Sequence, residues 1–535
     1  MVRRRHPGAL GVLPAGGAVD RVRQHRHRRA EREARRRPAE LRRAGHRHHV
    51  AGRRRPDVPG RRLGPGAVRE PRRVRGGGGP NGGGVRRRRV ADRRPEGHRG
   101  LGRGERPDRA GGLTHDVARR PVRETGRRVI RFARQGGTVI DDFGPTELWE
   151  PATRRDPHAF YARVRAAGRP VPQYDPAGNR FWIVARHADV LEGLQHPEIG
   201  HELHRHVEPD LSPSAYPPSE TERISSRQLI ALDPPDHTRL RRLVSTAFTA
   251  RTVARLEDWI AGVAAELVTH VRALGRFDAV TDLADPLPVN VIAQLVGVPD
   301  EDRARFRDWS ATIVSASDYD GAATLAFADY VDELAARRRA DPRDDLISAL
   351  VAQEAQGDAL DRDELVAMVQ LLLIAGQETT VDVIANSLRL LLTHPEQWHD
   401  LLADPALAGA AVEETLRFRG PVEIVPPRFA FRELDLAGGT IPAFERVGLS
   451  LWGANRDPEV FSSPDMFDLH RADVAGHIAF GYGTHFCLGA SLGRLEARLM
   501  LEAVARELPG LELTAEVDDV RLHHGGALPL QIGRT

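Results

Sequence analysis

The sequence contains no lysine and only one cysteine among its 535 residues. A single cysteine cannot form an intrachain disulfide or supply a cysteine-rich zinc site. Cys487 is therefore either a small buried hydrophobic residue or a reactive or metal-ligating thiolate. The longest apolar run, at 371–376, is much shorter than the roughly 18 residues that a membrane-spanning helix needs. No signal-peptide pattern occurs, so we expect a soluble protein of the reducing cytoplasm with no membrane contact.

The first 129 residues also lack Ile, Phe, Trp and Tyr. Residues 1–130 hold 39 Arg against 12 Asp plus Glu, a net charge of +27, whereas the rest of the chain has 40 Arg against 62 acidic residues. A segment of this composition buries too little apolar surface to offset the conformational entropy lost on folding. We therefore expect an Arg/Gly/Pro-rich head over 1–136 that does not fold alone.

Three interpretations of this head compete. Its arginine runs, such as 86–89, would bind nucleic-acid phosphates, but the stacking aromatics typical of single-strand binders are missing. The second interpretation is a disordered extension. The third is a translation start assigned too early in GC-rich DNA, which would spell Arg, Gly, Pro, Ala and His without Lys, Ile or Phe. We favour the last two, although DNA binding that disappears when residues 1–136 are removed would support the first.

From about Thr138 the composition becomes that of an ordinary globular protein. This part is longer than the roughly 100–200 residues of a typical domain, and its length alone would suggest two domains. No linker or internal repeat interrupts it. We therefore predict one large domain over 137–535.

Helical periodicity and capping signals predict a mainly α fold with a small β portion. The helices are expected over 156–168, 187–196, 237–247, 250–273, 289–297, 301–315, 321–338, 344–354, 361–393 and 405–418. Short strands are expected within 171–186, after 421, at 511–515 and at 528–532. A further helix is expected to begin directly after Cys487. The Pro-, Ser- and His-rich residues 197–236 are predicted to form a long functional loop.

The single cysteine lies in the segment FGYGTHFCLG. The expected helix start beside it offers a positive end and free N–H groups, which stabilise a thiolate. Gly481, Gly483 and Gly489 let the backbone lie close to something flat, and His485 supplies a cation or a donor. The segment therefore indicates a planar metal cofactor with one axial thiolate from Cys487. A merely buried cysteine would need neither the glycines nor the histidine.

A second motif, AGQETT, lies inside the apolar helix predicted over 361–393. Ala375 and Gly376 have minimal side chains, which would open room or a kink in the helix. Glu378 and Thr379 follow, and a carboxylate beside an alcohol could relay protons to a bound oxygen species. The alternative is a threonine that only bonds the carbonyl four residues before it.

Two further motifs also have an ordinary alternative. Glu414 and Arg417 are one helical turn apart, as in many surface ion pairs. His237 and Arg241 share one face of a predicted helix, where they could bind an anion or simply be solvated.

In this order, the motifs resemble those of the cytochrome P-450 family of haem-thiolate monooxygenases, especially its soluble bacterial members of the actinobacterial type. FGYGTHFCLGA is similar to the family's haem loop, AGQETT to its oxygen-activation helix, and ETLR to the Glu-x-x-Arg of a following helix. PPRFA, ANRDPEVF and PDMFDLHR are similar to the segments between that helix and the haem loop. The resemblance covers about 138–535, and Phe444 is a departure at a position where glycine is usual.

The resemblance implies a haem b cofactor, an iron protoporphyrin, with Cys487 as the axial thiolate on iron. Glu378 and Thr379 would be catalytic, delivering protons to dioxygen beside Ala375 and Gly376. Four cations would pair with the haem propionates; they are His237, Arg241, Arg428 and His485. Phe480 would pack on the sulfur side of the ring, and Gly489 would lie against the cofactor. Glu414, Arg417 and Arg456 would form a structural network.

The implied reaction is RH + O2 + two electrons + two protons giving ROH + H2O, a hydroxylation or epoxidation in secondary metabolism. The chain has no Gly-x-Gly-x-x-Gly fingerprint, so electrons would come from a ferredoxin and its NAD(P)H-dependent ferredoxin reductase. An acidic ferredoxin would dock on a local basic patch. The candidates for that patch are Arg239, Arg242, Arg494 and Arg498.

The implied substrate is a medium-to-large apolar small molecule. Its pocket would be lined by the 197–232 loop, Leu372–Gly376, Val425–Pro426 and residues 523–528. Peroxygenase, coupling and desaturase chemistry are alternatives on the same cofactor, but the intact Glu378–Thr379 pair favours ordinary use of dioxygen. A thiol hydrolase built from His485 and Cys487 is disfavoured, because a spacing of two residues orients nucleophile and base poorly.

Overall fold

The computed structural model describes residues 143–207, 219–314, 321–353, 360–514 and 527–533. All of them fall within one compact unit, Val129–Thr535. The predicted head, 1–136, and its boundary with the predicted domain lie outside the described residues.

The described chain is mainly helical, as the sequence predicts. Its α-helices are α2 (Pro151–Arg155), α3 (Pro157–Ala167), α4 (His187–Gln195), α5 (Glu220–Ser226), α6 (Asp236–Ser245), α7 (Ala250–Leu274), α8 (Pro286–Val296), α9 (Arg303–Val314), α10 (Ala322–Ala340), α11 (Leu346–Gln353), α12 (Arg362–Thr393), α13 (Pro395–Ala403), α14 (Ala408–Arg419), α15 (Leu451–Ala454) and α16 (Ala490–Glu507).

Three details of the helix prediction were wrong. Residues 197–236 are not one loop, because a capping box between Ser219 and Glu222 starts the short helix α5. Helix α13 was missed, although Pro395 stands at its first turn, a common helix start. Helix α16 begins at Ala490 and not directly after Cys487.

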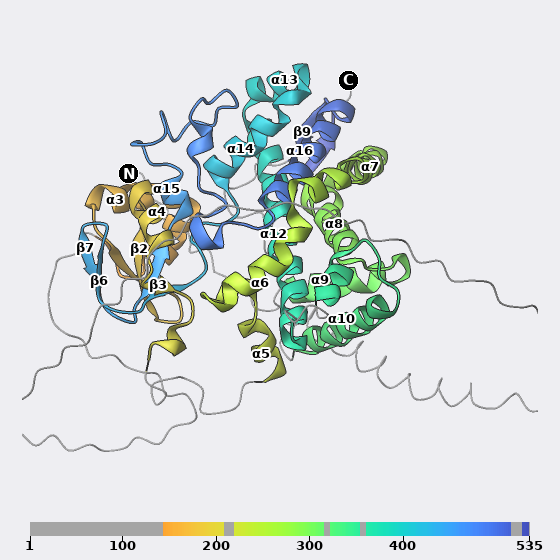
Figure 1. Cartoon of the computed structure of the whole chain (residues 1–535). Helices are drawn as coiled ribbons and strands as arrows, with labels where there is room; N and C mark the ends of the chain where they lie inside the picture. The colour runs from red at the N-terminus through yellow and green to blue at the C-terminus, as the bar shows by residue number, and fades with distance from the viewer. Residues whose placement is uncertain (1–142, 208–218, 315–320, 354–359, 515–526, 534–535) are drawn as a thin grey trace, which may run out of the picture. The chain divides into compact units, whose positions relative to one another are not determined.

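Helix α12 lies at the centre of the described residues, with α8, α9 and α10 on one side and α14 and α16 on another (Figure 1). A capping box between Asp361 and Glu364 starts it. Its side chains belong to both of the larger hydrophobic clusters. Among the described residues, α12 is the one helix long and apolar enough to cross a membrane by length and composition alone. Most of it is buried in the core, as a central helix should be.

The β portion forms three small sheets. The strands are β1 (Val171–Tyr174), β2 (Arg180–Val184), β3 (Ile199–Gly200), β4 (Arg276–Asp278), β5 (Arg428–Ala430), β6 (Leu434–Leu436), β7 (Gly439–Ile441), β8 (Arg446–Leu449), β9 (Leu511–Leu513) and β10 (Pro529–Ile532). The largest sheet has the order β1-β2-β8-β5-β3, and β10 lies between β4 and β9. In the largest sheet, β3 and β5 are antiparallel with Gly200 opposite Phe429. This register places the residue after β3, His201, near Arg428.

Phe444 lies in an exposed turn with a backbone φ of 65°. This left-handed conformation is costly for a residue with a Cβ and free of cost for glycine. The departure from glycine noted in the sequence therefore strains the turn locally. The backbone N–H of Phe444 still donates to the carbonyl of Ala430, at 2.7 Å.

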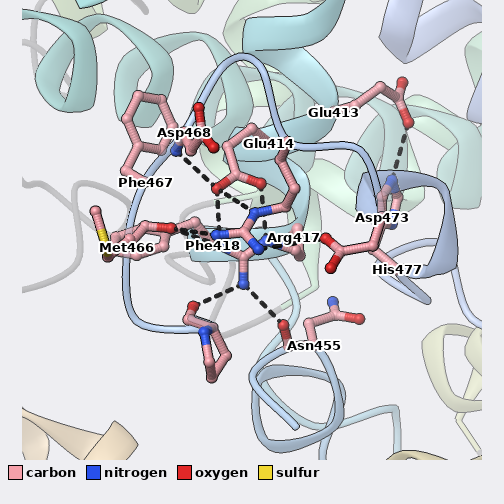
Figure 2. Close-up of polar contacts among 12 residues, drawn as sticks. Glu413, Glu414, Arg417, Phe418, Asn455, Met466, Phe467, Asp468, Asp473 and His477 are labelled. Atoms are coloured by element: carbon pink, nitrogen blue, oxygen red, sulfur yellow. Dashed lines mark hydrogen bonds and ion pairs between the residues drawn. The ribbon is translucent and has the colours of Figure 1, made fainter. Parts of the chain in front are cut away.

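Glu414 and Arg417 form a buried ion pair and not a surface pair, with side chains 1% and 0% exposed. Two nitrogens of the guanidinium donate to the two carboxylate oxygens of Glu414 at 2.7 Å each (Figure 2). The remaining donors reach three backbone carbonyls, those of Asn455 at 3.1 Å, Pro464 at 2.8 Å and Met466 at 3.0 Å. The pair therefore connects α14 to the irregular segment that precedes the loop around Cys487, residues 480–489, called the cysteine loop below.

Arg456 lies in the same segment, as the resemblance implied. Its guanidinium donates to the carbonyl of Phe418 at 2.9 Å and to Asp465 at 3.0 Å. It also lies 3.6 Å from the centre of the Phe418 ring, a cation–π contact. Arg456 therefore fastens this segment to the end of α14.

We predict that Arg417→Ala lowers the free energy of unfolding by about 3–5 kcal/mol, because it leaves the Glu414 carboxylate buried without its partner. Denaturant unfolding of the full chain, followed by circular dichroism, measures the change. Arg255→Ala is the control, since Arg255 pairs with Asp344 at the surface and should cost at most about 1 kcal/mol. Equal effects of the two substitutions would contradict a structural role for Arg417.

Candidate active site

A cavity of about 480 Å³ lies between α12, the cysteine loop and the segment that leads into β5, residues 421–428. One part of its wall carries cationic and histidine side chains, namely His201, His237, Arg241, Arg428 and His485. Another part is apolar and includes Leu229, Ile230, Leu371, Leu372, Val422, Ile424 and Val425. Cys487 and Thr379 also line the same cavity. One cavity therefore combines a thiol, a cationic cluster and an apolar surface.

The cysteine loop is closed by a hydrogen bond from the N–H of Cys487 to the carbonyl of Phe480, at 2.9 Å. Gly481 and Gly483 have φ values of 69° and 72°, which favour glycine. A Cβ added to Gly489 would meet no atom within 4 Å, so this position leaves open space beside the sulfur. Cys487 itself is exposed on the cavity wall and is not packed as a core residue. This excludes the interpretation of Cys487 as a small buried hydrophobic residue.

Although Cys487 is exposed to the open cavity, the protein around it displaces enough water to raise the pKa of its thiol in the protein alone. A hydrogen bond from the Gly489 backbone and the charges of Arg241 and Arg494 act in the opposite direction. The sequence analysis expected a thiolate stabilised by the helix end, but α16 starts three residues further on. A metal ion that coordinates a thiol deprotonates it, so the sulfur can still serve as a ligand.

The cationic cluster contains nitrogen atoms with no protein partner. Both ring nitrogens of His237 and the Nε of Arg428 are buried without a hydrogen bond, while the Nη1 of Arg428 donates to the carbonyl of Leu194 at 3.3 Å. The rings of His237 and His485 are 4.1 Å apart. Arg241 donates to the carbonyl of Phe486 at 2.6 Å. Four of the predicted residues therefore meet at one place.

The cluster is electrostatically unfavourable as it stands. Burial lowers the pKa of His237 to about 4 and of His485 to about 2, and neighbouring cations lower both further. Burial also lowers the pKa of Arg241 and of Arg428. Asp233 is the acidic residue whose charge opposes this effect on His237 and Arg428. Buried donors that lack acceptors fit an anion that enters from the cavity.

Helix α12 is continuous through the AGQETT motif. The hydroxyl of Thr379 donates to the carbonyl of Ala375, four residues earlier, at 2.6 Å, as a threonine with a purely local role would. Thr379 nevertheless also lines the cavity. A Cβ on Gly376 would lie 3.0 Å from the Cδ1 of Ile292, so this glycine also permits close packing against α8. Glu378 is half-buried and does not line the cavity.

Of the arginines expected to form a docking patch, Arg239, Arg494 and Arg498 are paired with carboxylates. Arg494 binds Glu413 at 2.6 and 3.0 Å, and its guanidinium lies 4.3 Å from the centre of the Phe480 ring. Arg498 binds Glu257 and Glu502, each at 2.6 Å. Arg239 binds Glu364. These pairs leave less net positive charge for a partner than the sequence suggested.

The predicted pocket segments line the cavity in three of four cases. Leu229 and Ile230 represent the 197–232 segment, and residues of Leu372–Gly376 and Val425–Pro426 contribute directly. The fourth segment, 523–528, lies mostly outside the described residues. Its last residue, Leu528, is fully buried in the hydrophobic core.

Sequence reasoning did not single out two polar residues of the cavity wall. His201 lies within the predicted 197–232 pocket segment but was not named, and Glu496 lies outside every predicted segment. Glu496 is 3% exposed, its Oε2 has no hydrogen-bond partner, and burial raises its pKa to about 8. A signal for it was present, because it follows the apolar Leu492 by four residues and precedes the apolar Leu499 by three. A carboxylate at helical spacing on an apolar face is unusual.

Comparisons with known proteins give the family of this chain. The Cytochrome P450 family model matches residues 321–508. A vitamin D(3) 25-hydroxylase of Pseudonocardia autotrophica is 40% identical over 387 residues, which cover 72% of this chain and 93% of the relative. The chain belongs to the cytochrome P450 family.

Two further relatives support the assignment to the cytochrome P450 family. The cyclomarin C epoxidase CymV of Salinispora arenicola is 38% identical over 346 residues, covering 63% of this chain and 85% of the relative. The crystal structure of a myxobacterial cytochrome P450, CYP267B1, in complex with myristic acid has a TM-score of 0.66 and 38% identity, and it covers 73% of this chain and 99% of that one. This P450 is a haem-thiolate monooxygenase, an oxidoreductase that incorporates molecular oxygen.

The residues of this P450 fit a haem. The unpartnered nitrogens of His237 and Arg428 match the two carboxylates that a haem carries. The open space at Gly489 and the accessible Cys487 lie on the same cavity wall. A planar dianionic cofactor with a thiolate ligand therefore suits the cavity.

We predict that Glu496→Gln makes this P450 more stable than wild type at pH 8 and leaves it nearly unchanged at pH 5. Because burial disfavours the charged carboxylate, the folded protein holds the Glu496 proton up to a pKa of about 8, whereas the unfolded chain releases it near pH 4.5. The folded state then binds more protons, so stability falls as the pH rises between these values. Each pKa unit corresponds to about 1.4 kcal/mol.

Thermal unfolding of the haem-loaded protein between pH 5 and 8.5 measures this difference. Glu502→Gln is the matched control on α16, because Glu502 is paired with Arg498. It should not gain stability with rising pH. A Glu496→Gln protein less stable than wild type at pH 8 would show that the Glu496 charge has a partner.

Proposed function

We propose that this P450 binds haem b through Cys487 and inserts one atom of O2 into a medium-to-large apolar molecule of secondary metabolism, by hydroxylation or epoxidation. The observation that carries the proposal is the single cavity that joins the sulfur of Cys487, the cationic cluster and the hydroxyl of Thr379. When bound, the haem supplies the activation of O2 with two electrons. The protein supplies the ligand, the anion site, the proton path and the substrate surface.

The proposed binding roles follow from the side chains. Cys487 is the axial ligand on a loop whose glycines admit a flat ring. His237, Arg241, Arg428 and His485 neutralise the two carboxylates of the haem. Phe480 lies at the sulfur side, where its carbonyl accepts the N–H of Cys487.

The proposed catalytic residues are Thr379 and Glu378. The hydroxyl of Thr379 donates to the Ala375 carbonyl, so its oxygen can accept a hydrogen bond from solvent, and rotation of the hydroxyl would let it donate to another acceptor. Glu378 is adjacent on α12 and half-buried outside the cavity, where it can take protons from water. Together they would carry protons to the reacting oxygen from the α12 side.

The apolar wall supports an apolar substrate. Leu229, Leu372 and Val425 come from three separate segments of the chain and line the same cavity. One of the relatives is named a vitamin D(3) 25-hydroxylase, and another is named a cyclomarin C epoxidase. These names support hydroxylation or epoxidation of a bulky apolar molecule.

Electrons would come from a ferredoxin and an NAD(P)H-dependent ferredoxin reductase in the cytoplasm. The described chain offers paired arginines such as Arg494 and Arg498 near the cysteine loop. A ferredoxin carboxylate would have to compete with Glu413 and Glu502 for them. We therefore propose a contact that is only moderately sensitive to salt.

We predict that the dithionite-reduced, carbon monoxide-treated protein shows a Soret band red-shifted to the position characteristic of thiolate-ligated haem. Cys487→Ala should abolish this band, because the chain has no other cysteine. A chain that begins near Thr138 should give the same spectrum as the full chain if the head, 1–136, is dispensable.

Other spectra would contradict the proposal in distinct ways. A histidine-type Soret position in the wild-type protein would move the axial ligand away from Cys487. A folded wild-type protein that takes up no haem would overturn the function as a whole.

We predict that Thr379→Ala lowers the product formed per NAD(P)H consumed by about 10-fold or more, with the lost electrons recovered as hydrogen peroxide. Loss of a positioned proton donor typically costs at least this much. Vitamin D3 and myristic acid serve as probe substrates, with a ferredoxin and its reductase added. Thr379→Ser, which keeps the hydroxyl, should retain most of the coupling. Unchanged coupling in Thr379→Ala would remove Thr379 from the proton path.

A further inference from the structure

We propose that His201 is a fifth binding residue for the haem carboxylates and donates a hydrogen bond from its Nε2. The resemblance to the P450 family did not point to this residue, and its side chain reaches the cavity from the end of β3. The inference rests on the proposed placement of the haem against Cys487.

The backbone of His201 is held rigidly. Its N–H donates to both carboxylate oxygens of Asp233, at 3.1 and 2.9 Å. The N–H of Glu202 donates to the same carboxylate at 2.8 Å, and the N–H of Asp233 donates back to Glu202 at 2.8 Å. On its other side, β3 is paired with β5. A side chain on such a fixed backbone is well placed for a specific contact.

His201 lines the cavity, and one of its two ring nitrogens has no hydrogen-bond partner. Its Nδ1 lies 3.1 Å from the carbonyl of Pro427, and a carbonyl can only accept, so Nδ1 carries a proton. Its Nε2 is buried and has no hydrogen-bond partner. The ring lies 4.8 Å from the ring of His485, which in turn contacts His237. Nε2 therefore belongs to the cationic cluster and lacks a partner within the protein.

The groups that face His201 favour an anion over a further cation. Arg428 and His237 lower its pKa, Asp233 and the Pro427 carbonyl raise it, and burial is the largest cause of a pKa of about 4. Because the Asp233 carboxylate already accepts the backbone N–H groups of His201 and Glu202, its charge is held by the backbone of this segment. A carboxylate that arrives at Nε2 would raise the pKa of the ring, which would then take up a proton and donate to the carboxylate.

This carboxylate could belong to the haem or to an acidic substrate such as a fatty acid. We assign it to the haem, because His201 packs on His485 and lies beside Arg428, whereas the substrate wall is apolar. The test separates the two sources.

The experiment compares the full-length wild type with His201→Gln, each loaded with haem or with haem dimethyl ester, whose carboxylates are blocked. The rate of haem loss to excess apomyoglobin is followed by Soret absorbance. We expect His201→Gln to lose haem about 10-fold faster than wild type, since one charge-assisted hydrogen bond is removed. With the dimethyl ester the two proteins should lose the cofactor at equal rates. His204→Gln is the matched control, because His204 is an exposed histidine of the same segment, and it should change neither rate.

A second measurement, the pH dependence of haem loss, tests the proposal even if the haem dimethyl ester binds too weakly for its loss to be followed. The rate of haem loss from wild type should rise between pH 6 and 9, because the imidazole ring of His201 loses its proton over this range. This rise should be smaller in His201→Gln. Equal acceleration of haem and ester loss, without a change in pH dependence, would overturn the proposal and leave His201 a structural residue. Unchanged haem loss with weaker binding of myristic acid would assign the carboxylate to the substrate. Failure of the wild type to bind haem through Cys487 would refute the proposed function and not this contact alone.

Discussion

The buried guanidinium of Arg417 is the constraint on which the position of the cysteine loop depends. A guanidinium has five N–H donors, and the structure gives it hydrogen bonds to Glu414 and to three backbone carbonyls. One of these carbonyls belongs to Asn455, whose side chain accepts the N–H of Ile478 at 2.8 Å. Ile478 lies just before Phe480, where the cysteine loop begins. An interaction remote from the sulfur thus fixes the backbone that carries it.

The cavity shows the opposite situation, because its charges are left without partners inside the protein. His237 and Arg428 are buried with unpartnered nitrogens, and burying such groups is costly when nothing accepts their hydrogen bonds. A dianionic cofactor that pairs with these nitrogens binds only the folded state, so it also stabilises the fold. The protein without its haem should therefore be the less stable form, and the same residues serve both folding and function.

The AGQETT motif of helix α12 is compatible with both interpretations of Thr379, a local hydrogen bond and a proposed role in catalysis. The Thr379 hydroxyl bonds the helix carbonyl of Ala375 and also faces the cavity. This bond leaves the hydroxyl oxygen able to accept a hydrogen bond, so the local bond and the proposed catalytic role are compatible. Gly376 likewise serves packing against α8, while Ala375 leaves space in the cavity. A central helix can carry chemistry because neighbours on its other faces bury it.

The sequence by itself determined the helical class, most helix positions and the family-typical residues, because periodicity, caps and short motifs are local properties. It named Cys487, Thr379 and the four cations as candidate site residues, but it could not show that they share one cavity. It missed α5 and α13, whose signals are short and lie among prolines. Only the tertiary structure decided that Glu414 and Arg417 are buried and that Arg494 is neutralised by Glu413. It alone revealed His201, which reaches the site because β3 pairs with β5, more than 200 residues further along the chain. Burial and pairing of this kind depend on contacts between distant segments, which no local pattern records.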